Sequence, residues 1–158
     1  GLKVLPLNFA VRGAYTLMSA KYDQATSVSA GAVNSGNKLP GIPQSQLYAD
    51  IAWRSLDWLS KPKFTYTELG LDYRTIGKMY ANSLNTEAAN SYQLLGVRAS
   101  HNIKGGPHTL SFFGRVDNLT NKVYASSVVV DQQFNAYYEP GMPRNWIVGV
   151  KYSLAMNY

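Results

Sequence analysis

The sequence predicts an all-β fold, namely a portion of an antiparallel transmembrane β-barrel with about six long strands. Three observations predict it: long segments with apolar residues at every second position, connections that alternate between short and long, and a composition rich in tyrosine but poor in charge. A period of two directs successive side chains to opposite faces of a strand. In a membrane barrel, one such face meets lipid and the other lines a polar lumen.

The alternation begins in the N-terminal half of the chain. Segment 7–19 has apolar residues at odd positions and mostly small or polar residues at even positions, and segment 45–54 repeats this pattern. Segment 64–74 follows, although Phe64 and Tyr66 are out of phase with its later residues. Their phase predicts either a bulge or an aromatic girdle at the membrane interface.

The other three predicted strands are segments 91–101, 108–118 and 145–158. The last of them is apolar on one face and ends in an aromatic residue, which resembles the C-terminal signature of bacterial outer-membrane barrels. We therefore expect its apolar face to be the signal that the barrel-assembly machinery reads. This face consists of Val150, Tyr152, Leu154, Met156 and Tyr158.

The connections differ in length and composition. Segments 57–63 and 102–107 are short and contain proline or Gly-Gly-Pro, as tight turns require, whereas segments 22–44, 75–90 and 119–144 are long and rich in Ser, Asn, Gly and Pro. This asymmetry predicts short periplasmic turns and long outer loops. A soluble sandwich or small lipocalin-like barrel shares the alternation. The length and apolar character of the strands favour the membrane barrel.

Composition excludes several other classes. The chain of 158 residues has no cysteine, which excludes a disulfide framework and cysteine zinc sites. No stretch approaches the roughly 18 consecutive apolar residues of a membrane helix. The net charge of +6 comes from scattered Lys and Arg residues without a basic run, so we expect no nucleic-acid partner.

Three motifs resemble a known family. They are residues 114–124 (GRVDNLTNKVY), residues 138–146 (YEPGMPRNW) before the closing strand, and residues 37–43 (NKLPGIP) before an earlier strand. Together they resemble the C-terminal part of the β-barrel of a TonB-dependent outer-membrane receptor. The resemblance implies a 22-stranded barrel with an N-terminal plug, located in the bacterial outer membrane. It also implies import of a nutrient, most commonly a metal chelate such as a ferric siderophore, with energy delivered by the TonB system.

The chain departs from that pattern because it contains six predicted strands, no plug and no segment that contacts TonB. We therefore expect residues 1–158 to be a C-terminal segment of the receptor barrel, a subunit that associates with other chains, or a piece with another structure. The first residues lack a secretory signal, so Gly1 is expected to be a processing boundary. The rival function is a small standalone outer-membrane structural or adhesion barrel.

Charged residues gather on the predicted lumen face of the strands. They could form a polar wall of cross-strand ion pairs, which includes contact with a plug, or they could attract an anionic chelate. These residues are Arg12, Arg54, Arg74, Arg98, Arg115 and Lys151, with the acids Asp50, Glu68, Asp72 and Asp117.

Five aromatic residues fall in the predicted outer loops. They could contact a flat ligand, pack the loops against one another, or belong to the outer aromatic girdle. They are Tyr80, Tyr124, Phe134, Tyr137 and Tyr138.

No catalytic, metal or cofactor site is predicted. His101 and His108 flank one predicted turn and could face each other, but two histidines without a carboxylate or cysteine do not make a closed metal site. Neither histidine has a serine and a carboxylate in a recognisable catalytic arrangement, and no glycine-rich phosphate loop follows a strand. We therefore expect a protein that is not an enzyme.

Overall fold

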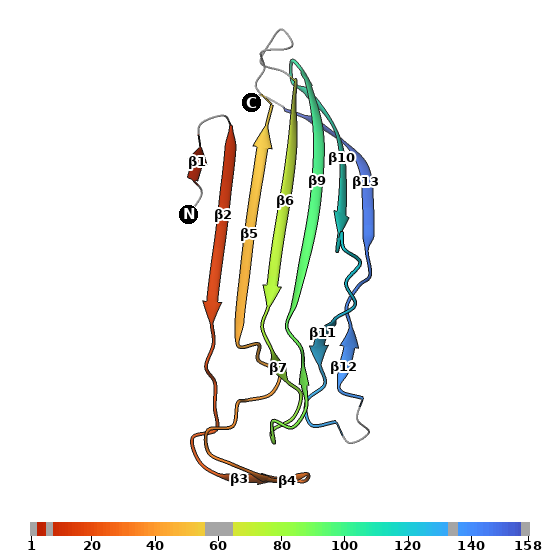
Figure 1. The fold of residues 1–158 in the computed structure, drawn as a ribbon. Helices are drawn as coiled ribbons and strands as arrows, with labels where there is room; N and C mark the ends of the chain where they lie inside the picture. Colours follow the sequence, from red (N-terminus) through yellow and green to blue (C-terminus); the bar gives the residue numbers. More distant parts are fainter. Residues whose placement is uncertain (1–2, 6–7, 56–64, 133–135, 156–158) are drawn as a thin grey trace.

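The computed structural model describes residues 3–5, 8–55, 65–132 and 136–155, and these residues form antiparallel strands, turns and loops. Seven strands make one sheet in the order β1-β2-β5-β6-β9-β10-β13 (Figure 1). Their bounds are Lys3–Leu5 (β1), Phe9–Leu17 (β2), Ser45–Arg54 (β5), Thr65–Ile76 (β6), Tyr92–Gly105 (β9), His108–Asp117 (β10) and Asn145–Leu154 (β13). No helix in the described parts of the chain is long and apolar enough to cross a membrane.

The six predicted long strands and their antiparallel order are confirmed, with shifts at their ends. The largest shift is in β9, which continues to Gly105 because residues 102–105 stay paired with β10. The turn predicted over residues 102–107 is therefore wrong in extent, since only Gly106 and Pro107 separate the two strands. Gly106 has a φ of 59°, which suits the first position of a primed hairpin turn. The turn predicted at residues 57–63 lies outside the described residues.

The phase change in β6 does not come from a bulge within the described strand. From Thr65 to Ile76 the pairing with β9 proceeds one residue at a time, without a register shift. Tyr66 instead lies on the polar face of the sheet, where the guanidinium carbon of Arg54 is 4.5 Å from its ring centroid. A cation over the ring gives this tyrosine a favourable contact on an otherwise polar surface.

The long loops contain three small hairpins that the sequence does not predict (Figure 1). Strands of two to four residues are too short to display a period of two. The hairpins are β3 (Thr26–Val28) with β4 (Gly31–Val33), β7 (Met79–Tyr80) with β8 (Ala88–Ala89), and β11 (Ala125–Val128) with β12 (Tyr138–Pro140). Four of the five buried hydrophobic residues among those described lie in the loops, namely Val33, Met79, Ala81 and Ala89. The loops thus pack into a small core of their own.

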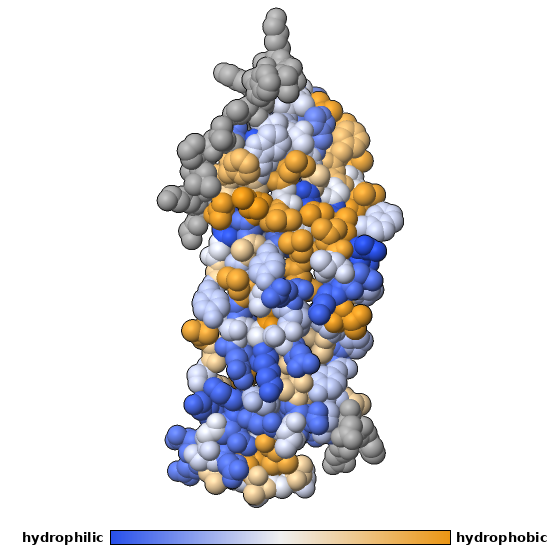
Figure 2. Space-filling view, viewed as in Figure 1, coloured by the Kyte–Doolittle hydropathy of each residue, from blue (hydrophilic) through white to orange (hydrophobic). Residues whose placement is uncertain are grey.

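The main sheet has two faces of different character. The register places twelve exposed large apolar side chains on one face, which we call the apolar face. These are Tyr15, Leu17, Ile51, Leu69, Leu71, Ile103, Phe112, Trp146, Val148, Val150, Tyr152 and Leu154. Figure 2 shows hydrophobic side chains gathered towards the end of the molecule that holds the β9–β10 turn, and hydrophilic ones towards the long-loop end. A sheet in a membrane barrel has this apolar band and these polar loops.

Candidate functional site

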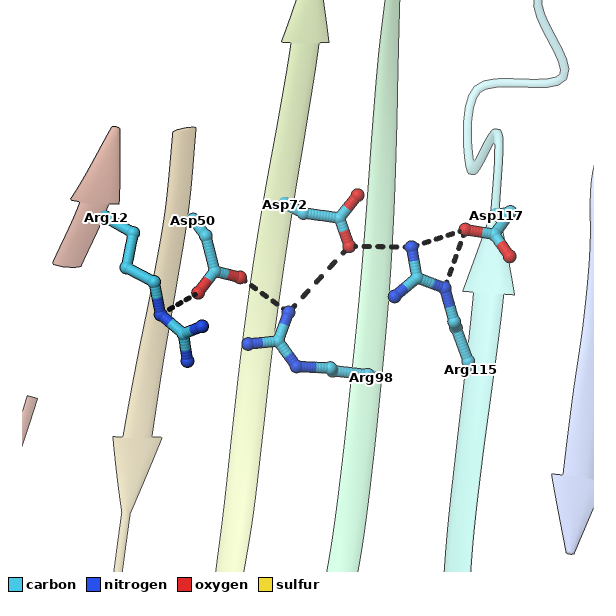
Figure 3. Close-up of polar contacts among 6 residues, drawn as sticks. All are labelled: Arg12, Asp50, Asp72, Arg98, Arg115 and Asp117. Atoms are coloured by element: carbon cyan, nitrogen blue, oxygen red, sulfur yellow. Dashed lines mark hydrogen bonds and ion pairs between the residues drawn. The ribbon is translucent and has the colours of Figure 1, made fainter. Parts of the chain in front are cut away.

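A row of charged side chains crosses the other face of the sheet, which we call the arginine face. Figure 3 shows Arg12, Asp50, Arg98, Asp72, Arg115 and Asp117 in one chain of contacts, and these residues belong to β2, β5, β6, β9 and β10. Arg98 Nη1 donates a hydrogen bond to Asp50 Oδ2 at 2.6 Å, and Arg12 Nε lies 3.8 Å from Asp50 Oδ1. Arg115 Nη2 lies 2.7 Å from Asp117 Oδ1. Charge-assisted contacts of this kind are among the stronger polar interactions in proteins.

Asp72 links the two halves of this row. Its Oδ1 atom lies 3.1 Å from Arg115 Nη2 and 3.9 Å from Arg98 Nη1. The same buried oxygen accepts no hydrogen bond from the described residues, because neither contact has hydrogen-bond geometry. The attraction at Asp72 is therefore that of charge, without a directed hydrogen bond.

Arg12 is directly opposite Asp50, but the register makes the pairs of Arg98 and Arg115 with Asp50 and Asp72 run diagonally. Asp50 is directly opposite Asp72 on β6, and Arg98 is directly opposite Arg115, so these two directly opposed pairs carry like charges. Arg98 reaches Asp50 by lying over Gly70, where an added Cβ would be only 2.4 Å from the guanidinium carbon. A side chain at position 70 would therefore displace Arg98, and glycine permits the close approach.

Burial of the acids leaves a basic surface. The side chains of Asp50 and Asp72 are 2% and 10% exposed, whereas those of Arg12 and Arg115 are 61% and 36% exposed. The guanidinium groups thus lie over these two carboxylates, whereas Asp117 at the end of the row is 40% exposed. An approaching molecule meets mainly positive charge, although the six residues of the row are neutral in sum.

The remaining predicted wall residues lie outside this row. Arg54 pairs with Glu68 at 3.1 Å, and their side chains are 56% and 33% exposed. Arg74 and Lys151 make no ion pair with any described residue.

The predicted loop aromatics mostly contact other loop residues. The rings of Tyr92 and Tyr124 have centroids 4.4 Å apart, those of Tyr137 and Tyr138 are 6.2 Å apart, and Lys78 Nζ lies 4.6 Å from the Tyr80 ring centroid. Phe134 lies outside the described residues.

A cleft of about 540 Å³ separates the β6–β9 and β10–β13 loops, and it is lined by Tyr92, Lys122, Tyr124 and Tyr138 among others. A second cleft of about 440 Å³ shares Tyr92 and Lys122 with it. The Tyr138 hydroxyl donates to Glu87 Oε2 at 3.2 Å. Partial burial, and then this hydrogen bond, raise the pKa of Tyr138. The clefts therefore combine aromatic rings, a hydroxyl donor and an ammonium group.

Ser83 joins three outer loops, and sequence reasoning missed it. Its amide and hydroxyl donate to the Asp131 carboxylate at 2.8 and 2.7 Å, and its hydroxyl also bonds to Tyr22 at 2.9 Å. Asn37 Nδ2 donates to the Ser83 carbonyl at 3.0 Å. Ser83 is 1% exposed, so the junction excludes water. No local pattern reveals it, because its members come from three separate loops.

Asn118 explains part of the motif at residues 114–124. Its backbone has a φ of 49°, a left-handed conformation that asparagine tolerates better than most residues. Its amide donates to the carbonyls of Lys122 and Met142 at 2.8 and 3.1 Å, and its Oδ1 accepts from the Lys122 amide at 2.8 Å. This side chain therefore fixes the exit of β10 and the return of the chain towards β13.

The two histidines do not face each other. His101 is opposite Phe112, and its Nδ1 is 3.0 Å from Thr67 Oγ1, whereas His108 Nδ1 is 2.6 Å from the Tyr152 hydroxyl. The expectation that they lie opposite one another is wrong, because the turn is tighter and closer to His108 than predicted. The described residues contain no group of three or more His, Cys, Asp or Glu placed to hold a metal.

The predicted assembly signal lies on β13. Val150, Tyr152 and Leu154 are exposed on the apolar face, at 61%, 61% and 48%. Met156 and Tyr158 lie outside the described residues.

Comparisons with known proteins agree with this architecture. A family model for the TonB dependent receptor-like beta-barrel matches residues 3–119, which is more than half of the chain. Among solved structures, the chain is similar to BauA, the ferric preacinetobactin receptor of Acinetobacter baumannii, with a TM-score of 0.73 and 22% identity over 96% of this chain. The chain spans 20% of the length of that receptor. On the family match and the shared fold, the chain belongs to the β-barrel family of TonB-dependent receptors.

Proposed function

We propose that residues 1–158 form the C-terminal segment of the barrel of a TonB-dependent transporter, which imports a metal chelate such as a ferric siderophore. Membership of the family indicates the outer membrane of a Gram-negative bacterium. The observation that carries the proposal is an open sheet with one apolar face and one arginine face. A sheet of this kind suits the wall of a water-filled barrel, with lipid outside and a polar lumen inside.

The edges of the sheet support the need for further strands. β1 pairs with only three residues of β2, and in the described residues β13 pairs on one side alone. Unpaired backbone groups in lipid cost several kcal/mol each, so open edges do not persist in a membrane. We infer that earlier strands of the same receptor pair with both edges and close the barrel.

The arginine face supports contact with a plug. The carboxylates of Asp50 and Asp72 are covered and the guanidinium groups of Arg12 and Arg115 are accessible, so acidic side chains of a plug domain would complete the pairing. In the proposed transporter, the plug in turn contacts the TonB system. The same positive surface would attract an anionic chelate that passes through the lumen.

The inter-loop cleft supports a role of the outer loops in ligand capture. Its rings, at Tyr92, Tyr124 and Tyr138, offer flat surfaces, and Lys122 offers a positive charge. Flat, anionic metal chelates present the complementary chemistry. The similar receptor is one for ferric preacinetobactin, which makes a ferric siderophore the first ligand to test.

Uptake by the complete protein tests this proposal. The full reading frame would be expressed in an iron-limited strain that lacks its own siderophore receptors, with and without a working TonB. Ferric preacinetobactin, other ferric siderophores, copper and cobalamin would be offered as probes. We expect uptake of one ferric chelate only where TonB works. Uptake of no probe, or uptake independent of TonB, would contradict transport and favour a standalone structural or adhesion barrel.

We also propose that Tyr158 is part of the signal read by the barrel-assembly machinery. The apolar face of β13 is exposed and continues towards the terminus, as a readable strand requires. We expect Tyr158→Ala in the complete protein to reduce the amount of heat-modifiable, protease-resistant barrel in outer membranes. If the variant assembles as well as the unchanged protein, residues 149–154 become the better candidate for the signal.

A further inference from the structure

A groove crosses the apolar face over β6, β9, β10 and β13. The register arranges its floor and walls in three cross-strand rows, and the middle row contains the two smallest residues, Ala99 and Gly114, opposite each other. The rows are Thr67, His101, Phe112 and Val150; then Leu69, Ala99, Gly114 and Val148; then Leu71, Val97, Val116 and Trp146. The larger side chains of the outer rows leave a depression over the middle row.

Two hollows make up this groove. They measure about 590 and 490 Å³ and share Ala99, Gly114 and Val148. Each has the size of a small-molecule site. A groove on a lipid-facing surface is filled by hydrocarbon, because water there would leave its hydrogen bonds unmade.

One end of the groove is polar. His101 Nδ1 and Thr67 Oγ1 lie 3.0 Å apart, and these two are the only polar side chains in the three rows. No described residue bonds to the second ring nitrogen of His101, and this side chain is exposed. A polar group without a partner is costly at a lipid-facing position. We therefore expect His101 Nε2 to form a hydrogen bond with a molecule outside the described residues.

This polar end lies on the side of the groove nearer the periplasmic turn. His101 lies four residues before the end of β9 at Gly105. At about 3.3 Å per residue and a tilt of about 40°, this is about 10 Å above the periplasmic turn. The groove then leads from His101 past Ala99 towards the middle of the bilayer.

We propose that this groove binds one glycerophospholipid of the periplasmic leaflet. An acyl chain lies over Ala99 and Gly114, and a glycerol ester or phosphate oxygen accepts a hydrogen bond from His101 Nε2–H. In this arrangement the Thr67 hydroxyl donates to His101 Nδ1, which leaves the proton on Nε2. The order of chemistry along the groove, polar at the periplasmic end and apolar towards the bilayer centre, is that of a phospholipid. The proposal rests on the outer-membrane orientation above and does not depend on which nutrient is imported.

Photo-crosslinking of the complete protein tests the proposal. The protein would be reconstituted in phosphatidylethanolamine and phosphatidylglycerol vesicles that contain phosphatidylethanolamine with a photoreactive acyl chain, and crosslinked peptides would be mapped. We expect labelling of residues 97–101 and 112–116 above that of β2 and β5. Labelling spread evenly over the apolar face would overturn the proposal, as would a crosslinked second copy of the protein in the groove.

Two variants and a matched control sharpen the test. Gly114→Leu fills the groove, and its Cβ meets only ordinary contacts, the nearest being Val148 Cγ1 at 3.6 Å. Gly13→Leu makes the same change on the apolar face of β2, where the nearest atom is 3.7 Å away. We expect labelling in the groove to fall about tenfold in the first variant and to stay unchanged in the second. His101→Phe should lower it about fivefold by removing one hydrogen bond. Equal labelling in Gly114→Leu and Gly13→Leu would contradict the proposal.

Discussion

Replacing Arg98 by methionine is expected to lower the free energy of unfolding of the complete protein by about 3 kcal/mol, at the lower end of the cost of breaking a buried ion pair. The Asp50 side chain is 2% exposed, and Arg98 is the only described residue that donates a hydrogen bond to it. Arg12 would remain, at 3.8 Å, as its nearest charge partner. Arg98 itself is 26% exposed, so water screens part of the interaction and the lower end of the range applies.

Two further variants test whether the loss of stability comes from leaving the Asp50 charge buried without a partner. Arg54→Met breaks the more exposed pair with Glu68, and we expect it to cost less than about 1 kcal/mol. The double variant Arg98→Met with Asp50→Leu removes both charges of the buried pair, and it should recover most of the lost stability. The measurement is urea unfolding in phosphatidylcholine vesicles, followed by tryptophan fluorescence. If Arg98→Met costs no more than Arg54→Met, the row of charges does not stabilise the barrel wall.

Placing a lysine on the apolar face of β13 is expected to have a similarly large effect. Val148 is 69% exposed on that face and lies near the middle of the strand. Lysine at the bilayer midplane costs about 2–4 kcal/mol in membrane barrels, because its charge leaves water for hydrocarbon. We therefore expect Val148→Lys to lower the free energy of unfolding by about this amount. Less heat-modifiable barrel should reach outer membranes.

Ile147→Lys is the matched control, because Ile147 is the neighbouring residue on the arginine face. It is opposite Arg115, whose partners Asp72 and Asp117 are close by, so the added charge meets acids as well as one arginine. Its cost should stay within about 1 kcal/mol, as for a surface charge in a polar lumen. Equal losses for Val148→Lys and Ile147→Lys would mean that the apolar face does not meet lipid.

The long strands and the character of their faces were predictable from the sequence. A strand imposes a period of two on its side chains, so the alternation in segments such as 45–54 displays both the strand and its two environments. Tyr66 is out of phase in the sequence, but it still obeys the alternation of side chains along β6, since it lies on the arginine face beneath Arg54. Proline and glycine likewise reveal the β9–β10 turn, although they leave its ends uncertain by a few residues.

The outer loops could not be predicted in the same way. The junction at Ser83 draws Tyr22 and Asn37 from the β2–β5 loop and Asp131 from the β10–β13 loop, and no motif in the sequence shows that these residues meet. The short loop hairpins are stabilised by packing between loops, as at buried Val33 and Ala81. Such contacts form between segments that are distant in the sequence, and the local propensity of each segment does not show which other segment it will meet.

The sequence by itself determined which residue types line each face, because alternation is a local property of a strand. It placed Arg98 and Asp50 on one face and Ala99 and Gly114 on strands that share the other. Only the tertiary structure decided which of them meet. Register sets Asp50 beside Asp72 and thereby sends Arg98 across Gly70, and it sets Ala99 opposite Gly114 to open the groove on the apolar face. Register is a relation between strands, fixed by the pairing of their backbones along the whole sheet, and no single segment contains it.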